Sequence, residues 1–108
     1  MTIEYIRYKL PSDQKEAFIE GYQQASEQLD ASTFCLSYEL AECEEEAGEF
    51  ILRIEWTSTE EHLNGFRKSA EFSKFFSHVK PFFANIQEMR HYKQTGVVKE
   101  KRHEGSNS

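Results

Sequence analysis

The residues with the clearest chemical potential lie in one stretch of the chain, from Trp56 to Phe66. Trp56 is the only tryptophan, His62 follows it by six positions, and Phe66 follows His62 by four positions, which is about one helical turn. A tryptophan at the end of a strand, with a histidine and a phenylalanine on the next helix, can surround a small space. Aromatic walls with one or two polar groups are typical of pockets for small ligands. The sequence therefore predicts a small aromatic or hydrophobic ligand beside Trp56.

Histidine is the side chain whose unperturbed pKa lies closest to neutral pH, which makes His62 a candidate general base. Sheet alternation adds Tyr38 and His91, which we expect on the same side of the sheet as Trp56, where they can orient a ligand. A purely structural interpretation stays open at this point. In that interpretation Trp56 and the phenylalanines fill the core, and His62 is a partly exposed helix residue.

The elements that must position these residues follow first from alternation of apolar and polar side chains, which is typical of strands. Met1–Leu10, Phe34–Cys43 and Glu49–Trp56 show this alternation, and Ile86–Thr95 shows a diluted form of it. The second and third of these strands flank the acidic turn Glu44–Gly48, which predicts a hairpin. The residues of the second strand that we expect to face the helices are Phe34, Leu36, Tyr38 and Leu40.

One helix is predicted between the first two strands. Asp13 followed by Glu16 matches an N-cap with a capping box, and the helix should run to about Leu29. Apolar positions recur along it at helical spacing, so they lie on one side and can be buried together. The predicted buried face consists of Ala17, Phe18, Tyr22, Ala25 and Leu29.

Two further helices are predicted after the third strand. Ser58 begins a capping box that opens a helix over Thr59–Lys68, and this helix carries His62. Ser69 is the predicted N-cap of the next helix, over Ala70–Val79. The apolar stripe of that helix consists of Phe72, Phe75, Phe76 and Val79.

The resulting order, β-α-β-β-α(α)-β, predicts an α+β fold of the split βαβ, ferredoxin-like type. This is a four-stranded antiparallel sheet with helices on one face. We expect one such domain over residues 1–95. Residues 96–108 are polar and lack periodicity, which predicts a disordered tail.

The face of the sheet that is turned away from the helices needs a cover, and we predict that a second copy of the chain provides it. A chain of 108 residues buries only about two-thirds of its unfolded surface, so a homodimer would add to a thin core. Arginine and glutamate on the same face can pair across a twofold axis. The residues predicted on this face are Tyr5, Arg7, Lys9, Glu39, Ile51, Arg53 and Glu55.

Composition excludes several classes of partner. The formal net charge is −6, so the chain repels phosphate backbones and nucleic acid is not expected. No apolar run approaches the roughly 20 residues needed to span a bilayer, and residues 1–25 lack the core of a signal peptide. We therefore expect a cytoplasmic protein without membrane contact. Cys35 and Cys43 are eight positions apart on one predicted strand, too distant to form a disulfide within one chain.

Several of these features together resemble the antibiotic biosynthesis monooxygenase (ABM) family. They are the strand that ends at Trp56, the helix capped by Ser58 with its early His62, the aromatic second half, and the closing segment Glu88–Tyr92. The resemblance covers roughly residues 2–95. It implies a ferredoxin-like fold that forms a dimeric α/β barrel. The family includes cofactor-free oxygenases of polycyclic aromatics, quinol oxygenases and haem-degrading enzymes.

The resemblance implies a cofactor-independent monooxygenase that acts on a small hydroxylated aromatic compound or a quinol. Such a substrate must lose a proton before it can pass an electron to oxygen, so the protein must supply a base and a dry aromatic cavity. His62 is the predicted base, and Trp56 matches the tryptophan that lines the family's pocket, so both are predicted catalytic residues. The predicted substrate-binding residues are Tyr38, Phe66, Phe75 and His91.

No cofactor is expected. The haem-degrading members of the family have an asparagine in the first strand and a histidine where Phe66 stands here, and Met1–Leu10 contains no asparagine. Haem is therefore disfavoured. Two alternatives to the oxygenase stay open. One is a non-catalytic dimeric module that binds a small hydrophobic ligand or a partner protein, and the other is a structural dimer whose aromatic stretch is all core.

Overall fold

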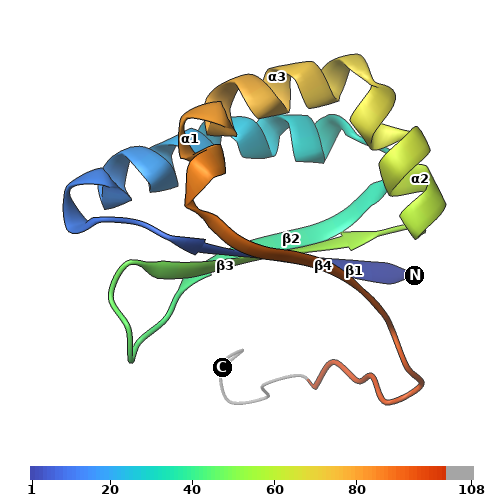
Figure 1. Ribbon diagram of the computed structural model, residues 1–108. Helices are drawn as coiled ribbons and strands as arrows, with labels where there is room; N and C mark the ends of the chain where they lie inside the picture. The colour runs from blue at the N-terminus through green and yellow to red at the C-terminus, as the bar shows by residue number, and fades with distance from the viewer. Residues whose placement is uncertain (102–108) are drawn as a thin grey trace, which may run out of the picture.

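A four-stranded antiparallel sheet with helices on one face forms the framework of the protein, as the computed structural model shows for residues 1–101 (Figure 1). The strand order is β2-β3-β1-β4, which confirms the predicted ferredoxin-like fold. β1 and β3 are therefore the central strands, and β2 and β4 are the edges. The strands are β1 (Thr2–Lys9), β2 (Cys35–Glu42), β3 (Glu49–Trp56) and β4 (Ile86–Lys93).

The register of the central strands determines which side chains meet at one end of the sheet. Thr2 pairs with Trp56, and Glu4 pairs with Ile54 on one side and with His91 on the other. Residues directly opposite each other in a sheet point to the same face. Glu4 and His91 therefore lie side by side on the face that the helices cover.

The predicted pattern of β2 is wrong at its beginning. Cys35 pairs with Trp56, but Ser37 pairs with Glu55, so Leu36 is an extra residue in a β-bulge. The bulge shifts the alternation by one position. As a result Cys35 packs against the core and Leu36 is 49% exposed, the reverse of the sequence-based expectation.

The first helix, α1 (Lys15–Ala31), also begins differently from its prediction. Asp13 is not an N-cap, because it lies in a 3-10 turn (Ser12–Gln14) that follows Pro11, and the helix start has no side-chain cap. The backbone N–H of Gln14 donates to the Pro11 carbonyl at 3.0 Å, so the turn gives one backbone N–H before the helix a partner. Four of the five residues predicted for its buried face are buried, and Ala17 is exposed.

The helix that carries His62, α2 (Thr59–Asn64), is capped as predicted. The Ser58 hydroxyl accepts a hydrogen bond from the backbone N–H of Glu61 at 3.0 Å. The helix is shorter than the predicted range Thr59–Lys68, since Gly65 is its C-cap. There a side chain would collide with the ring of Phe34, since a Cβ at this position would lie 2.7 Å from a Phe34 ring carbon. A 3-10 turn (Phe66–Lys68) follows.

The helix that carries the phenylalanine stripe, α3 (Ala70–Val79), has the predicted bounds. Its cap is also confirmed, because the Ser69 hydroxyl accepts from the backbone N–H of Phe72 at 3.3 Å. A 3-10 segment (Lys80–Asn85) then leads to β4. α1 and α3 lie side by side over the sheet (Figure 1).

The core lies between the sheet and this helical layer. It is unusually aromatic, and many of its rings meet edge to face, as Phe18 does with Tyr22 and Phe82. The buried apolar residues are Ile6, Tyr8, Leu10, Phe18, Tyr22, Ala25, Leu29, Phe50, Leu52, Ile54, Trp56, Phe66, Phe75, Val79 and Phe82.

The opposite face of the sheet carries the mixed side chains that were predicted for it, and no helix of residues 1–101 covers it (Figure 1). Ile51 is 39% exposed there, and Arg7 forms an ion pair with Glu88 at 3.8 Å. In the same range, no helix is long and apolar enough to cross a membrane. Residues 94–101 form no helix or strand, and the rest of the predicted tail, residues 102–108, lies outside the described part.

Candidate functional site

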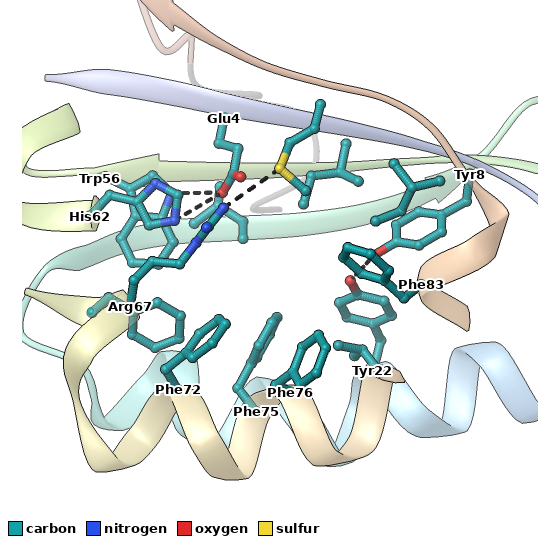
Figure 2. Close-up of a pocket in the computed structure, with 16 residues that line it drawn as sticks. Glu4, Tyr8, Tyr22, Trp56, His62, Arg67, Phe72, Phe75, Phe76 and Phe83 are labelled. Atoms are coloured by element: carbon teal, nitrogen blue, oxygen red, sulfur yellow. Dashed lines mark hydrogen bonds and ion pairs between the residues drawn. The ribbon is translucent and has the colours of Figure 1, made fainter. Parts of the chain in front are cut away.

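A cavity of about 370 Å³ lies between the sheet and α3, at the place that the sequence predicts, beside Trp56. Half of the residues that line it are aromatic. Figure 2 shows three phenylalanines of α3 directed into it, with Tyr8, Tyr22 and Phe83 at one end. The opposite end is polar, and there Glu4, His62 and Arg67 approach one another. The phenylalanines of α3 are Phe72, Phe75 and Phe76.

The polar end is organised by four side chains, Glu4, Trp56, His62 and His91, here called the polar cluster, which two hydrogen bonds and one close contact join. The indole Nε1–H of Trp56 donates to Oε1 of Glu4 at 3.1 Å. Nε2 of His62 lies 3.5 Å from the same oxygen, and its Nδ1 lies 2.8 Å from Nε2 of His91. The imidazole of His62 also stacks on the indole, with 4.2 Å between ring centroids and 8° between planes.

Local structure explains how His62 reaches this position. β3 ends at Trp56, and the cap at Ser58 starts α2 two residues later. The first turn of α2 then carries His62 back over the indole. His62 and Glu4 are each 2% exposed and Trp56 is fully buried, so three members of the polar cluster are withdrawn from water, whereas His91 is partly exposed.

Burial changes the acid–base properties of the polar cluster. Desolvation raises the pKa of Glu4, although the hydrogen bond from Trp56 and the charge of Arg67 act in the opposite direction. Desolvation lowers the pKa of His62 to about 3, and the charges of Arg67 and His91 lower it further. The pKa of His91 is also lowered, by burial first and by Arg67 second. His62 is therefore a neutral imidazole near pH 7.

This result corrects the reason for choosing His62 as a base. A base for a phenol must have a pKa close to the working pH, and a histidine with a pKa of about 3 is a weak proton acceptor. Glu4 is the group whose pKa moves toward neutrality, and it lines the cavity. The catalytic roles predicted for His62 and Trp56 stay predictions, and Glu4 joins them as the stronger candidate base.

The structure brings together most of the predicted site residues. Trp56, His62, Phe66 and Phe75 line the cavity. His91 stands behind His62, to which it is hydrogen-bonded, and does not line the cavity.

Tyr38 lies elsewhere. It is 38% exposed, and its hydroxyl donates to Asp30 at 2.7 Å. It borders a second hollow, of about 450 Å³, between α1 and the β2 edge. The reason is topological, because β2 is an edge strand and is separated from β1 by β3. Alternation placed Tyr38 on the correct face of the sheet but could not show that its strand lies at the edge opposite β4, away from Glu4 and His91.

Two charged residues of the site were missed by sequence reasoning. Glu4 lies on the same buried face of β1 as Ile6 and Tyr8. A carboxylate among apolar residues of a buried face is itself a signal of a functional site. Arg67 follows Phe66 in a 3-10 turn, and no pattern in the sequence marks it. Its guanidinium lies 5.9 Å from the centre of the Phe72 ring, and no carboxylate of residues 1–101 lies within ion-pair distance of it.

Glu4, His62 and His91 are also close enough to share a metal ion, since one ligand atom from each lies within 4.8 Å of the others. Two histidines and a carboxylate suit divalent first-row metals. The nitrogens of His62 face Glu4 and His91, the other two members of this group, and the charge of Arg67, which acts on all three, opposes a bound cation. The same engagement leaves no free nitrogen of His62 for a haem iron. The polar cluster is therefore described as a hydrogen-bonded network.

Comparison with known proteins identifies a family and a fold. The model of the family described as antibiotic biosynthesis monooxygenase matches residues 1–77. A search of curated proteins finds no match. Many solved structures share the fold.

Three of those structures illustrate the likeness. A Bordetella bronchiseptica protein named as an antibiotic biosynthesis monooxygenase is 21% identical with a TM-score of 0.76, and the match covers 87% of this chain and 96% of that one. A Chloroflexus aurantiacus protein with the same name is 16% identical with a TM-score of 0.71, over 91% and 96% of the two chains. A conserved protein from Methanosarcina mazei is 14% identical with a TM-score of 0.73, over 87% and 92%. At these identities the structural likeness concerns the fold alone.

Proposed function

The chain belongs to the antibiotic biosynthesis monooxygenase family, and we propose that it is a cofactor-independent monooxygenase that acts on a small hydroxylated aromatic compound or a quinol. The observation that carries this proposal is the position of Glu4. A buried carboxylate with a raised pKa lines an aromatic cavity and accepts a hydrogen bond from the family's strand-end tryptophan, Trp56. Perturbed carboxylates in clefts mark candidate catalytic sites.

The cavity suits a planar aromatic substrate. Rings from α3 line one side of it, and a substrate ring can lie among them by stacking or edge-to-face contact. Its hydroxyl group would then point to the polar end, where Glu4 accepts the proton. Arg67 borders the same end, so the resulting phenolate gains a favourable charge interaction in a site of low dielectric.

The deprotonated substrate can react with oxygen without a cofactor. One electron passes from the phenolate to O₂, and the radical pair combines to form a C–O bond and a peroxide anion. Glu4 then returns the substrate's proton to this peroxide, which gives a hydroperoxide. Loss of water from the hydroperoxide gives a quinone. One oxygen atom enters the product and the other leaves as water, and the substrate supplies all four electrons, so no external reductant is needed. The residues contribute deprotonation, orientation and exclusion of water.

Oxygen uptake with a panel of quinols and naphthols tests the proposal. We expect uptake by the wild type and a fall in kcat of about 10²- to 10⁴-fold in Glu4→Gln, because the proton acceptor is lost. Glu20→Gln, which changes an exposed glutamate of α1, is the matched control and should leave uptake unchanged. His62→Ala compares the original candidate base with Glu4. Binding of these compounds without any oxygen uptake would contradict the oxygenase.

That contradictory result would favour the second candidate function, a non-catalytic module for a hydrophobic ligand. The observation behind this alternative is the pKa of about 3 for His62, which leaves Glu4 as the single strong candidate base in the site. An aromatic cavity can bind an apolar ligand without any base.

We also propose that a second copy of the chain covers the open face of the sheet. This face combines exposed apolar atoms of Ile51 and Tyr92 with charges of both signs, which suits a self-complementary contact. Ile51→Lys should shift the protein to a monomer in sedimentation velocity. Ile19→Lys is a matched control, because Ile19 is 37% exposed on α1 and Ile51 is 39% exposed on the sheet. A wild type that sediments only as a monomer at micromolar concentration would refute the dimer.

A further inference from the structure

The end of the cavity opposite the polar cluster holds two buried hydroxyl groups, those of Tyr8 on β1 and Tyr22 on α1 (Figure 2). The two hydroxyls are hydrogen-bonded to each other, and the residues are 2% and 5% exposed. Their rings meet edge to face, with 5.9 Å between centroids. The two side chains, here called the tyrosine pair, therefore hold their oxygen atoms together at the wall of the cavity, away from bulk water.

A count of hydrogens shows that the tyrosine pair is incomplete. Each neutral phenol has one hydrogen to donate, but a hydrogen bond between two phenols uses only one of their two hydrogens. Whichever tyrosine donates, the other one retains an O–H group that needs an acceptor. Within residues 1–101 neither oxygen has a further hydrogen-bond partner. The tyrosine pair therefore carries one buried O–H donor that no group of the described chain accepts.

Both tyrosines keep their hydrogens near neutral pH. Burial raises the pKa of Tyr8 to about 12, and burial also raises the pKa of Tyr22 above its ordinary value. The charge of Glu4, at the other end of the cavity, raises the pKa of both hydroxyls further. Ionisation of one tyrosine would remove the surplus hydrogen, but burial disfavours it.

The side chains that pack on the tyrosine pair are aromatic. The ring of Phe18 lies 4.8 Å from that of Tyr8 and 5.2 Å from that of Tyr22, and the ring of Phe75 lies 6.0 Å from that of Tyr22, all between centroids. Aromatic rings accept hydrogen bonds only weakly. A water molecule at this end would also be held poorly, because buried waters typically make about three hydrogen bonds. A ligand atom that accepts the surplus hydrogen would therefore gain affinity.

We propose that the tyrosine pair is a second ligand-binding subsite, which donates its surplus O–H group to an oxygen atom of the ligand. With Glu4 at the opposite end, the ligand is an aromatic compound with a hydroxyl group at one end and an acceptor oxygen, of a carbonyl or an ether, at the other. Only the placement of the hydroxyl group at Glu4 rests on the proposed function. A phenol with a single oxygen would leave the buried donor unpaired, and sites built to make a hydrogen bond discriminate against such analogues.

Two ligands of nearly the same shape and acidity test the subsite, the para-methoxy and para-ethyl derivatives of α-naphthol. Only the methoxy compound has an ether oxygen opposite its hydroxyl group, and the ethyl compound is the more apolar of the two. Isothermal titration calorimetry under argon measures their binding without any reaction with oxygen. We expect the wild type to bind the methoxy compound more tightly, although burial of apolar surface alone favours the ethyl compound. Equal or weaker binding of the methoxy compound would overturn the inference.

The double variant Tyr8→Phe/Tyr22→Phe removes both hydroxyls and keeps both rings. The ethyl compound should then bind more tightly, so that the ratio of the two dissociation constants shifts by about tenfold or more from the wild-type ratio. Tyr38→Phe removes an exposed hydroxyl outside this cavity and is the matched control, which should keep the wild-type ratio. A double variant that keeps that ratio would overturn the inference.

Glu4→Gln locates the ether oxygen within the cavity. It changes the end that takes the hydroxyl group, which both compounds share, so it should weaken both by the same factor and leave their ratio as in the wild type. Loss of the preference in Glu4→Gln, together with its retention in the double variant, would place the ether oxygen at the polar cluster and overturn the inference.

Stability gives a readout that needs no ligand. Replacement of both members of a hydrogen-bonded pair by apolar groups of the same shape is nearly neutral or stabilising, and here it also removes a donor without an acceptor. The urea midpoint of the double variant should therefore be unchanged or higher. A clearly lower midpoint would show that a group of the protein already accepts the surplus hydrogen, and would overturn the inference.

The outcomes for the subsite and for the oxygenase can be told apart. The titrations exclude oxygen, so the shift in the ratio can appear in a protein that takes up no oxygen, and the subsite would then stand without the oxygenase. Oxygen uptake that depends on Glu4, without any shift in the ratio, would leave the oxygenase and remove the subsite.

Discussion

Acid should destabilise this protein through His62, and the size of the effect can be worked from the structure. Burial lowers the pKa of His62 from 6.5 to about 3, so the folded chain keeps this imidazole neutral where the unfolded chain protonates it. A histidine of lowered pKa contributes stability that is fully present above the unfolded value and is lost as pH falls below it. pH 5 lies one and a half units below the unfolded pKa of 6.5. Each unit corresponds to about 1.4 kcal/mol, so the free energy of unfolding falls by about 2 kcal/mol.

The perturbation that isolates this effect is His62→Gln, which removes the titrating ring and keeps a polar side chain. Urea unfolding at pH 7 and pH 5 gives the free energy of unfolding for the wild type and the variant. The wild type should lose about 2 kcal/mol more than the variant between the two conditions. His78→Gln controls for removal of a histidine as such and should behave as the wild type does.

Other groups that face His62 titrate too, and the double difference removes most of their contribution. Glu4 acts in the opposite direction, because a raised carboxyl pKa adds stability as pH falls through it, and His91 acts in the same direction as His62. Both are present in the wild type and in the variant. If the variant loses as much stability as the wild type between pH 7 and pH 5, His62 is not held neutral by burial, and the reasoning is refuted.

Three further expectations concern single side chains. Glu4→Gln should raise the free energy of unfolding at pH 8 more than at pH 5, because burial disfavours the ionised carboxylate. Urea unfolding at both pH values measures this, and a variant less stable than the wild type at pH 8 would contradict it. Phe75→Ala should lower the free energy of unfolding by about 3 kcal/mol, a small loss for a phenylalanine because this ring already borders a cavity. An unchanged urea midpoint would show that the ring is not packed. Ser58→Ala should cost about 1 kcal/mol by removing the cap of α2, and it should broaden the ring signals of His62, whereas unchanged signals would mean that the cap does not hold this ring.

The elements that sequence predicted well are those whose signals are local. Ser69 and the apolar stripe after it gave the bounds of α3, because the cap and the helical period are both written within a few residues. Strict alternation predicted both the first and the last residue of β3 correctly. Asp13 failed as a cap because it lies inside a 3-10 turn that follows Pro11, and this turn satisfies the backbone N–H of Gln14 in place of the groups that a cap would satisfy. A capping pattern does not show which turn precedes the helix.

Only part of the site could be predicted from the sequence, because some of its contacts depend on strand pairing. Trp56 and His62 are neighbours along the chain, so a strand end and one helical turn suffice to bring them together. Glu4 and His91 join them only through the register of three strands, and the bulge at Leu36 shows that register is not fixed by alternation alone. Tyr38 was expected beside the site, but alternation specifies only a face and carries no information on strand order, which puts β2 and β4 at opposite edges of the sheet.

Glu4 also shows why the site is better explained by function than by packing. Its neighbours on the buried face of β1 are apolar, and replacing a buried charged group by an apolar side chain of similar volume is often neutral or stabilising. A domain of 108 residues has little stability to spare, yet it keeps a desolvated carboxylate beside a cavity that its own aromatic rings do not fill. Both features cost stability in the folded chain. Under the proposed function both features have the same use, which is to hold an aromatic ring against a base of raised pKa, and neither improves packing.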